Sequence, residues 1–212
     1  MLTVACVLKS GGGYDASWVA RLRDAVAGRL SLPYRFVALS DVDVPCERVA
    51  LQFDWPGWWS KIELFRLRGP VLYFDLDTAI VGDLTEIAAH AMATPFAMLR
   101  DFYAPSHHGS GVMCWNGSSP DFIFERFAAF PEDMMKLTRA RMGDQAFIEE
   151  MVLGQSEISC WQDIVPGQIV SYKVHCRNGI PPNARVVCLH GKPKFGDMPA
   201  NDPVRIAWEQ AA

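Results

Sequence analysis

Two aspartates stand one residue apart directly after an apolar run. The run is "VLYF" (71–74), and Asp75 and Asp77 follow it. Such a run predicts a buried strand, and residues two apart on an extended chain point the same way. Ligands of open α/β sheets bind beyond the carboxyl ends of the strands. Two carboxylates at such an end suit a hard divalent cation such as Mg²⁺ or Mn²⁺, so the spacing favours metal binding over a solvated turn.

Two other classes of enzyme could use parts of this sequence. A phosphohydrolase of the haloacid dehalogenase type has a strand-borne D-x-D, but that motif carries Thr or Val where Ala79 stands here. A dinucleotide-binding oxidoreductase would use "GGGYDA" (11–16), with Asp41 after the next strand. Three consecutive glycines satisfy that pattern easily, and it leaves the two aspartates unexplained. The phosphohydrolase is therefore the stronger of the two alternatives.

The elements that must position the aspartates alternate along the chain. Predicted strands cover 2–8, 34–40, 46–53, 70–75, 95–101, 110–116 and 184–190. Predicted helices cover 16–30, 57–68, 83–91, 121–130 and 142–153. This alternation indicates an α/β fold whose central sheet is mostly parallel, partly mixed in the second half, and flanked by helices. Asp15 and Ser60 are expected to cap helices, and the tryptophans at 55, 58 and 59 are expected in the core.

Composition limits the class of protein. The chain has 212 residues, is 50% hydrophobic and carries a net charge of -4, which predicts one domain over 1–212 and no nucleic-acid partner. No run approaches the roughly 20 apolar residues of a membrane span, and no signal peptide is recognised. The six cysteines lack C-x-x-C spacing, so we expect reduced thiols in a cytoplasmic protein, with peripheral membrane association left open.

Four segments together resemble one known family. "KIELFRLRGPVLYFDLDTAIVGDL" (61–84) resembles the central block of glycosyltransferase family 8, the glycogenin-like and lipopolysaccharide galactosyltransferase-like enzymes of GT-A type. "SGVMCWN" (110–116) resembles the family's N-[AS]-G-V strand, and "GDQAFIEE" (143–150) resembles its D-Q helix. "VVCLHGKPKF" (186–195) resembles its late His-Gly-Lys-Pro segment. The resemblance spans most of the chain and implies a single GT-A domain with a Rossmann-like nucleotide-binding fold. It implies that residues 1–100 bind the nucleotide and the metal, and that residues 101–212 bind the donor and the acceptor.

The resemblance also implies an activity. It predicts a divalent-metal-dependent glycosyltransferase that moves a hexose from a nucleotide sugar, a UDP-sugar, with retention of anomeric configuration. The acceptor is open: it could be a carbohydrate, a lipid-linked molecule or a protein. The metal, Mn²⁺ or Mg²⁺, would be held by Asp75, Asp77 and His190, because oxygen ligands with one imidazole suit Mn²⁺ in particular.

The resemblance assigns the remaining site residues. Those expected to contact the donor are Ser10, Tyr14, Lys61, Asp75, Asp101, Ser110, Gly191, Lys192 and Lys194. Which of the two late lysines meets the diphosphate is open. Lys61, Asp144 and Gln145 are expected to be catalytic.

The sequence departs from the family pattern at one position. Gly109 stands where the family has Asn, so a sugar contact is either lost or supplied by His107 or His108. That departure leaves a third alternative, a module that binds nucleotide sugar without turnover.

Overall fold

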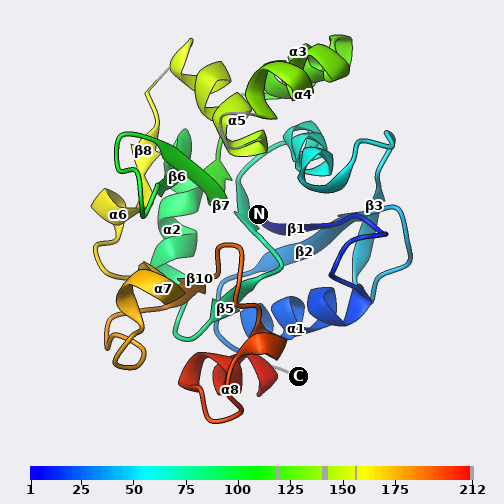
Figure 1. Ribbon diagram of the computed structural model, residues 1–212. Coiled ribbons are helices and arrows are strands. Elements are labelled where there is room, and N and C mark those ends of the chain that lie inside the picture. Colours follow the sequence, from blue (N-terminus) through cyan, green and yellow to red (C-terminus); the bar gives the residue numbers. More distant parts are fainter. Residues whose placement is uncertain (118–119, 140–142, 156, 211–212) are drawn as a thin grey trace.

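The computed structural model describes residues 1–117, 120–139, 143–155 and 157–210, and strands alternate with helices along them (Figure 1). Its large sheet has seven strands in the order β3-β2-β1-β4-β7-β6-β8. These are β3 (Glu47–Ala50), β2 (Tyr34–Ser40), β1 (Leu2–Leu8), β4 (Val71–Phe74), β7 (His108–Trp115), β6 (Phe96–Arg100) and β8 (Ser159–Cys160). Neighbours from β3 to β4 are parallel, whereas β7 is antiparallel to both β4 and β6. The predicted α/β fold with a mostly parallel, partly mixed sheet is confirmed.

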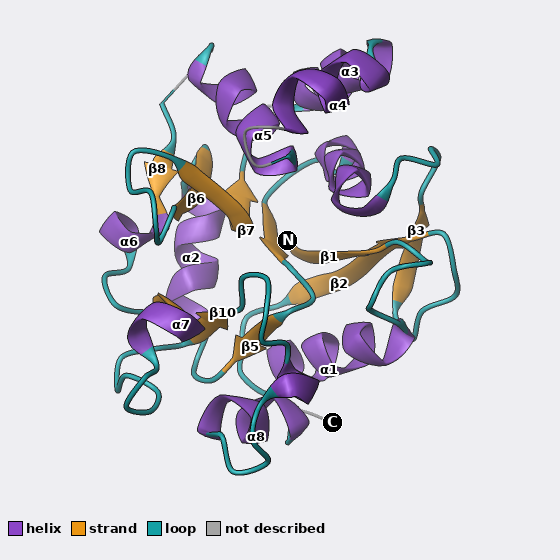
Figure 2. Ribbon diagram, in the orientation of Figure 1, coloured by secondary structure: helices purple, strands orange, loops and turns teal. Residues whose placement is uncertain are grey.

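Helices cover both faces of this sheet (Figure 2). The helices α1 (Ala16–Ala27) and α2 (Thr85–Ala93) pack on one face. The 3₁₀ helix η1 (Gly57–Arg66), α3 (Asp121–Ala129) and α5 (Asp144–Leu153) pack on the other. Strand side chains alternate between the faces, so in β1 Val4 and Cys6 join the first layer and Ala5 joins the second. Burial on both faces explains why these strands are continuous apolar runs.

A second, three-stranded sheet brings the end of the chain to the D-x-D segment. Its order is β5 (Thr78–Ile80), β10 (Val186–Cys188) and β9 (Ile169–Ser171). Strand β10 is antiparallel to β5, with Cys188 opposite Thr78. Beyond this pairing, the Leu189 amide donates to the Asp77 carbonyl oxygen at 3.2 Å. The sheet therefore places the residues after β10 beside the residues after β4.

The remaining helices lie outside the two sheets. They are α4 (Pro131–Arg139), α6 (Trp161–Ile164), α7 (Tyr172–His175), η2 (Phe195–Asp197) and α8 (Pro203–Glu209). None of these was predicted from the sequence. The predicted strand at 184–190 is shorter than expected, since only residues 186–188 pair.

The segment 57–68 differs most from its prediction. It is a 3₁₀ helix, and Ser60 lies inside it and donates to the Gly57 carbonyl at 2.8 Å, so the predicted Ser60 cap is wrong. The predicted Asp15 cap of α1 is confirmed. Of the three tryptophans expected in the core, Trp55 and Trp59 are buried, but Trp58 is 56% exposed. Trp58 is the second residue of η1, and the buried part of this helix begins only at Trp59.

The state of the cysteines and the length of the apolar helices can also be compared with the sequence. All six cysteines are free thiols, and four of them are buried. Across the described ranges, no helix is long and apolar enough to cross a membrane.

Candidate active site

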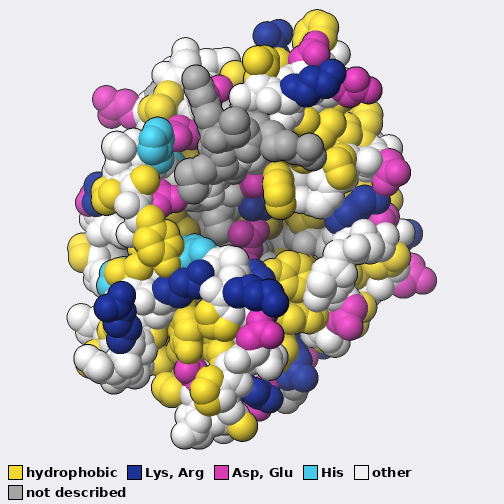
Figure 3. Space-filling model, in the orientation of Figure 1, with side chains coloured by type: hydrophobic (Ala, Val, Ile, Leu, Met, Phe, Trp, Pro, Cys, Tyr) yellow, Lys and Arg dark blue, Asp and Glu magenta, His cyan; other side chains and the backbone are white. Residues whose placement is uncertain are grey.

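A cavity of about 670 Å³ opens where β1 and β4 end, and its size lies within the usual range for ligand pockets. Figure 3 shows a hollow near the centre of this face, bordered by acidic, basic and histidine side chains. The predicted site residues that line the cavity are Tyr14, Lys61, Asp75, Asp77, Asp101, Ser110, Asp144, Gln145, His190 and Gly191. They come from both ends and the middle of the chain. Ser10, Lys192 and Lys194 are not part of the lining.

Lys61 lies at the bottom of the site and is buried. Its Nζ lies 3.0 Å from Asp75 Oδ1, 2.9 Å from Asp144 Oδ2 and 3.0 Å from Ser110 Oγ. An ammonium group has three N–H donors, and these three oxygens can accept all of them. Burial lowers the pKa of Lys61, but the charges of Asp144 and Asp75 outweigh it and hold that pKa above its ordinary value. Lys61 therefore stays charged and joins the two carboxylates.

Asp144 reaches Lys61 because of its place in α5. Gly143 occupies the N-cap position, so Asp144 is the first helical residue and does not cap the helix. Its Oδ2 also accepts the Ser110 hydroxyl at 2.8 Å. Gly143 has a φ of 66°, and a Cβ there would come within 2.5 Å of Trp58 Nε1. Both the backbone and the neighbouring indole thus require glycine before Asp144.

Tyr73 supports the first aspartate of the D-x-D, and the sequence analysis missed it. Its hydroxyl donates to Asp75 Oδ1. Burial and the charge of Asp75 raise the pKa of Tyr73, so the phenol stays protonated. The spacing in the sequence could have indicated this contact, because Tyr73 lies two residues before Asp75 and residues two apart on a strand face the same side.

Asp77 is buried and also has two partners. The Tyr14 hydroxyl donates to its Oδ2 at 3.1 Å, and Lys194 Nζ forms a salt bridge with the same oxygen. Burial raises the pKa of Asp77, and so does the charge of Asp75, while Lys194 opposes both. The two carboxylates of the motif thus repel each other, and each is paired with a lysine. Of the two late lysines, Lys194 reaches the site, and Lys192 is exposed.

His190 lines the same cavity, two residues after β10. Its Nε2 lies 3.0 Å from Ser171 Oγ, and its ring contacts those of Phe102 and Tyr103. Burial lowers the pKa of His190, which favours the neutral imidazole that a metal ligand needs. Within the described part of the chain, no three His, Cys, Asp or Glu side chains are grouped to hold a metal in this conformation.

The C-terminal helix fixes the segment that carries Lys194. Phe195 follows it directly, is fully buried and stacks on Trp208 of α8 with ring centroids 4.4 Å apart. Both rings also contact Trp18 of α1. The packing of α8 on α1 therefore anchors the chain between His190 and Phe195.

Ser10 does not line the cavity and instead binds Asp41. Its amide and hydroxyl donate to the Asp41 carboxylate at 2.8 and 2.6 Å. Lys9 binds the same carboxylate at 2.8 Å and itself lines the cavity, although the sequence analysis did not select it. Burial would raise the pKa of Asp41, but Lys9 and Ser10 outweigh it and hold that pKa well below its ordinary value. This network fixes the loop after β1.

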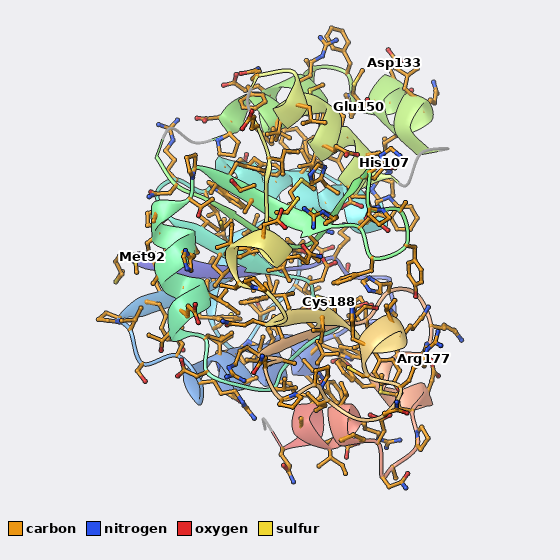
Figure 4. All side chains as sticks on the ribbon, turned by 90° about the vertical axis from the view of Figure 1, so that its left-hand side faces the viewer. Met92, His107, Asp133, Glu150, Arg177 and Cys188 are labelled. Atoms are coloured by element: carbon orange, nitrogen blue, oxygen red, sulfur yellow. The ribbon has the colours of Figure 1, made fainter. Side chains whose placement is uncertain are left out.

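The two histidines considered as substitutes for the missing Asn do not line the cavity. Nδ1 of His107 and Nδ1 of His108 lie 3.3 and 2.8 Å from the Glu149 carboxylate of α5. Figure 4 shows Cys188, a cavity residue, in the middle of the molecule, with His107 above it. Gly109 does line the cavity, so its lack of a side chain leaves space there.

Comparisons with known proteins agree at the level of the fold. No protein-family model matches the sequence, and neither does any curated protein. The glycosyltransferase GlyE of Streptococcus pneumoniae TIGR4 matches with a TM-score of 0.64 at 14% identity, over 99% of this chain and 59% of GlyE. An active-site mutant of LgtC matches with a TM-score of 0.60 at 11% identity, over 99% of this chain and 94% of LgtC.

A second LgtC structure, a galactosyltransferase in complex with donor and acceptor sugar analogues, gives a TM-score of 0.58 at 12% identity, with the same coverage. The chain spans about three-fifths of the length of GlyE and nearly all of LgtC. The predicted resemblance to GT-A glycosyltransferases of family 8 is confirmed in the fold. The chain has the GT-A fold of these glycosyltransferases.

Proposed function

We propose that this protein is a glycosyltransferase that moves a sugar from a nucleotide-sugar donor, a UDP-sugar, to an acceptor. One observation carries the proposal. Asp75, Asp77, His190 and Asp144 come from three distant segments and line one cavity at the carboxyl ends of parallel strands, in a GT-A fold. A site of that kind accommodates a ligand at the strand ends.

The donor set fits a divalent cation, Mn²⁺ or Mg²⁺, by its chemistry. Two carboxylates and an imidazole kept neutral by burial are ligands that Mn²⁺ accepts. Burial and the charge of Asp75 raise the pKa of Asp77, so positive charge beside it is favourable, and Lys61 and Lys194 supply such charge in this structure. When bound, the cation would neutralise the charge that develops on the leaving nucleoside diphosphate.

The chain's own residues would divide the remaining work. Lys194 would give up Asp77 and donate to a diphosphate oxygen, with the Gly191 amide as a further donor. Lys61 would hold Asp75 and Asp144 in place, since its three N–H groups are directed to protein oxygens. Asp144 and Gln145 would face the donor sugar. Hexosyl transfer with retention, and a cytoplasmic location supported by the free thiols, complete the proposal.

The alternatives have less support. A bound dinucleotide would place its pyrophosphate at the N-terminus of α1, but the Asp15 carboxylate already accepts the Ser17 amide there at 2.9 Å. The GT-A fold gives the phosphohydrolase no structural support.

The test measures UDP release from a panel of UDP-sugars, with Mn²⁺ or with EDTA. We expect release to need the metal and to fall by about 100-fold or more in Asp75→Asn and Asp77→Asn, because charge stabilisation of the leaving group is lost. Asp43→Asn is the matched control, since Asp43 is an exposed carboxylate outside the cavity.

Two results would contradict the proposal. Hydrolysis of p-nitrophenyl phosphate that Asp75→Asn abolishes would identify a phosphohydrolase. Metal-dependent UDP binding without UDP release from any donor would identify a binding module.

A further inference from the structure

Two strongly exposed aromatic side chains border the cavity. Trp58 is 56% exposed and Tyr103 is 61% exposed, and both belong to the cavity lining. Phe53 and Phe130 are exposed as well, but neither lines the cavity. Large aromatic groups kept in water beside a site indicate a surface that a ligand covers.

Trp58 is fixed beside the proposed chemistry. It precedes Lys61 by three residues in η1, and residues three apart in a 3₁₀ helix lie one above the other. Lys61 is buried, so Trp58 continues the same wall outward to the mouth of the cavity. The pyrrole part of its indole packs on Gly143, where an added Cβ would lie 2.5 Å from Nε1. The side chain is thus supported by the residue that precedes Asp144.

Tyr103 is fixed in a comparable way on another segment. Asp101 Oδ1 accepts the amides of Tyr103 and Ala104, both at 2.8 Å, which fixes the turn after β6. The Tyr103 ring meets the His190 ring edge to face, with centroids 5.9 Å apart. Trp58 therefore packs against the residue before Asp144, and Tyr103 packs against His190.

We propose that Trp58 and Tyr103 form the acceptor subsite and that the acceptor is a saccharide whose pyranose ring stacks on the indole. A pyranose has a C–H face and a rim of hydroxyl groups, and an aromatic ring with a polar edge matches both. The same cavity carries Asp101, whose carboxylate can accept hydrogen bonds from hydroxyl groups. An acyl chain would instead remove this carboxylate from water without replacing its hydrogen bonds. The assignment of the acceptor rests on the proposed function.

The test is a glycan array of mono- and oligosaccharides, probed with the protein in UDP and Mn²⁺. We expect Trp58→Ala and Tyr103→Ala each to weaken retention on the bound glycans by about tenfold, the equivalent of one lost ring contact. Trp58→Phe keeps an aromatic face and should bind at an intermediate level. Phe130→Ala is the matched control, an exposed aromatic residue outside the cavity, and should bind like the wild type.

The UDP-induced thermal shift, measured on every variant, separates this inference from the proposed function. It should stay at its wild-type value, because neither aromatic side chain is assigned to the nucleotide. Wild-type protein that binds UDP but no glycan would overturn the inference, and so would Trp58→Ala with unchanged glycan binding. Wild-type protein without a UDP shift would overturn the proposed function, whereas glycan binding that depends on Trp58 would still support a saccharide subsite.

A lipid acceptor surface is the other outcome that the experiment must detect. Vesicles of phosphatidylglycerol and phosphatidylcholine form a second arm, with the same four variants. Binding to vesicles that is lost in Trp58→Ala, without glycan binding, would assign the aromatic pair to a lipid surface and overturn the saccharide.

Discussion

Lys61 links the two acidic segments of the site. Asp75 follows β4 and Asp144 begins α5, and the ammonium of Lys61 lies within 3.0 Å of an oxygen of each. The sequence motifs predicted these three residue types, because each motif lies in its own continuous segment. They did not predict that the lysine would bind both carboxylates, because that contact depends on how η1 and α5 pack against β4 and β7.

Replacing Lys61 by Met tests this link. The variant leaves Asp75 and Asp144 without their shared counter-charge, and breaking a buried ion pair from one side costs about 3–5 kcal/mol. We expect the free energy of unfolding, measured with urea, to fall by that amount. Lys136→Met is the control, since Lys136 is exposed and lies 3.8 Å from Glu132; a change within about 0.5 kcal/mol is expected.

The double variant Lys61→Met with Asp144→Asn completes the thermodynamic cycle. Because Asp144→Asn removes one unpaired carboxylate, the double variant should lose less stability than the sum of the single losses. Additive losses would mean that the two groups do not stabilise each other.

The two late lysines make the second prediction for single residues. Lys194→Met should weaken UDP binding about tenfold or more, because a charge-assisted hydrogen bond to the diphosphate is lost. Binding of uridine, which has no phosphate, should stay unchanged. Lys192→Met is the matched variant, and titration calorimetry should show a change of less than about threefold. A larger loss of UDP affinity in Lys192→Met than in Lys194→Met would assign the diphosphate contact to Lys192.

At the scale of elements, length decided what could be predicted from the sequence. Strands β1, β2 and β4 are apolar runs with turn signals around them, and each was placed within about one residue of its bounds. Strand β5 has three residues and β10 has three, and they form a sheet only by pairing across more than a hundred residues. No local pattern encodes that pairing, so the contact of the chain's end with the D-x-D came only from the family resemblance.

The anchoring of the Lys194 segment by α8 gives the prediction at this scale. Phe195→Ala removes a fully buried ring from the contact with Trp208 and Trp18, so we expect a loss of about 3–5 kcal/mol in the free energy of unfolding. Binding of UDP should weaken in the same variant at temperatures where it remains folded, because Lys194 loses its support. Phe130→Ala is the exposed control, and equal losses in both variants would contradict the assigned role of α8.

At the scale of the whole molecule, the two predicted halves share one sheet. Strand β4, in the first half, pairs with β1 on one side and with β7 of the second half on the other. The site also needs both halves of the chain, since His190 and Asp144 belong to the second half and Asp75 belongs to the first. Neither half has a complete sheet or a complete site alone, so folding and ligand binding should both be properties of the entire chain.

This shared sheet predicts a single cooperative unfolding transition, in which far-UV circular dichroism and tryptophan fluorescence coincide. A ligand that contacts both halves should raise the midpoint temperature of that single transition. UDP with Mn²⁺ at about 100 times its Kd should stabilise the fold by about 2.7 kcal/mol, which for a chain of this size raises Tm by about 5–11 °C. UDP without metal should raise Tm less, and Asp77→Asn should remove the difference between the two conditions. Two separate transitions, with only one displaced by UDP and Mn²⁺, would show that the halves fold independently and that the ligand contacts only one of them.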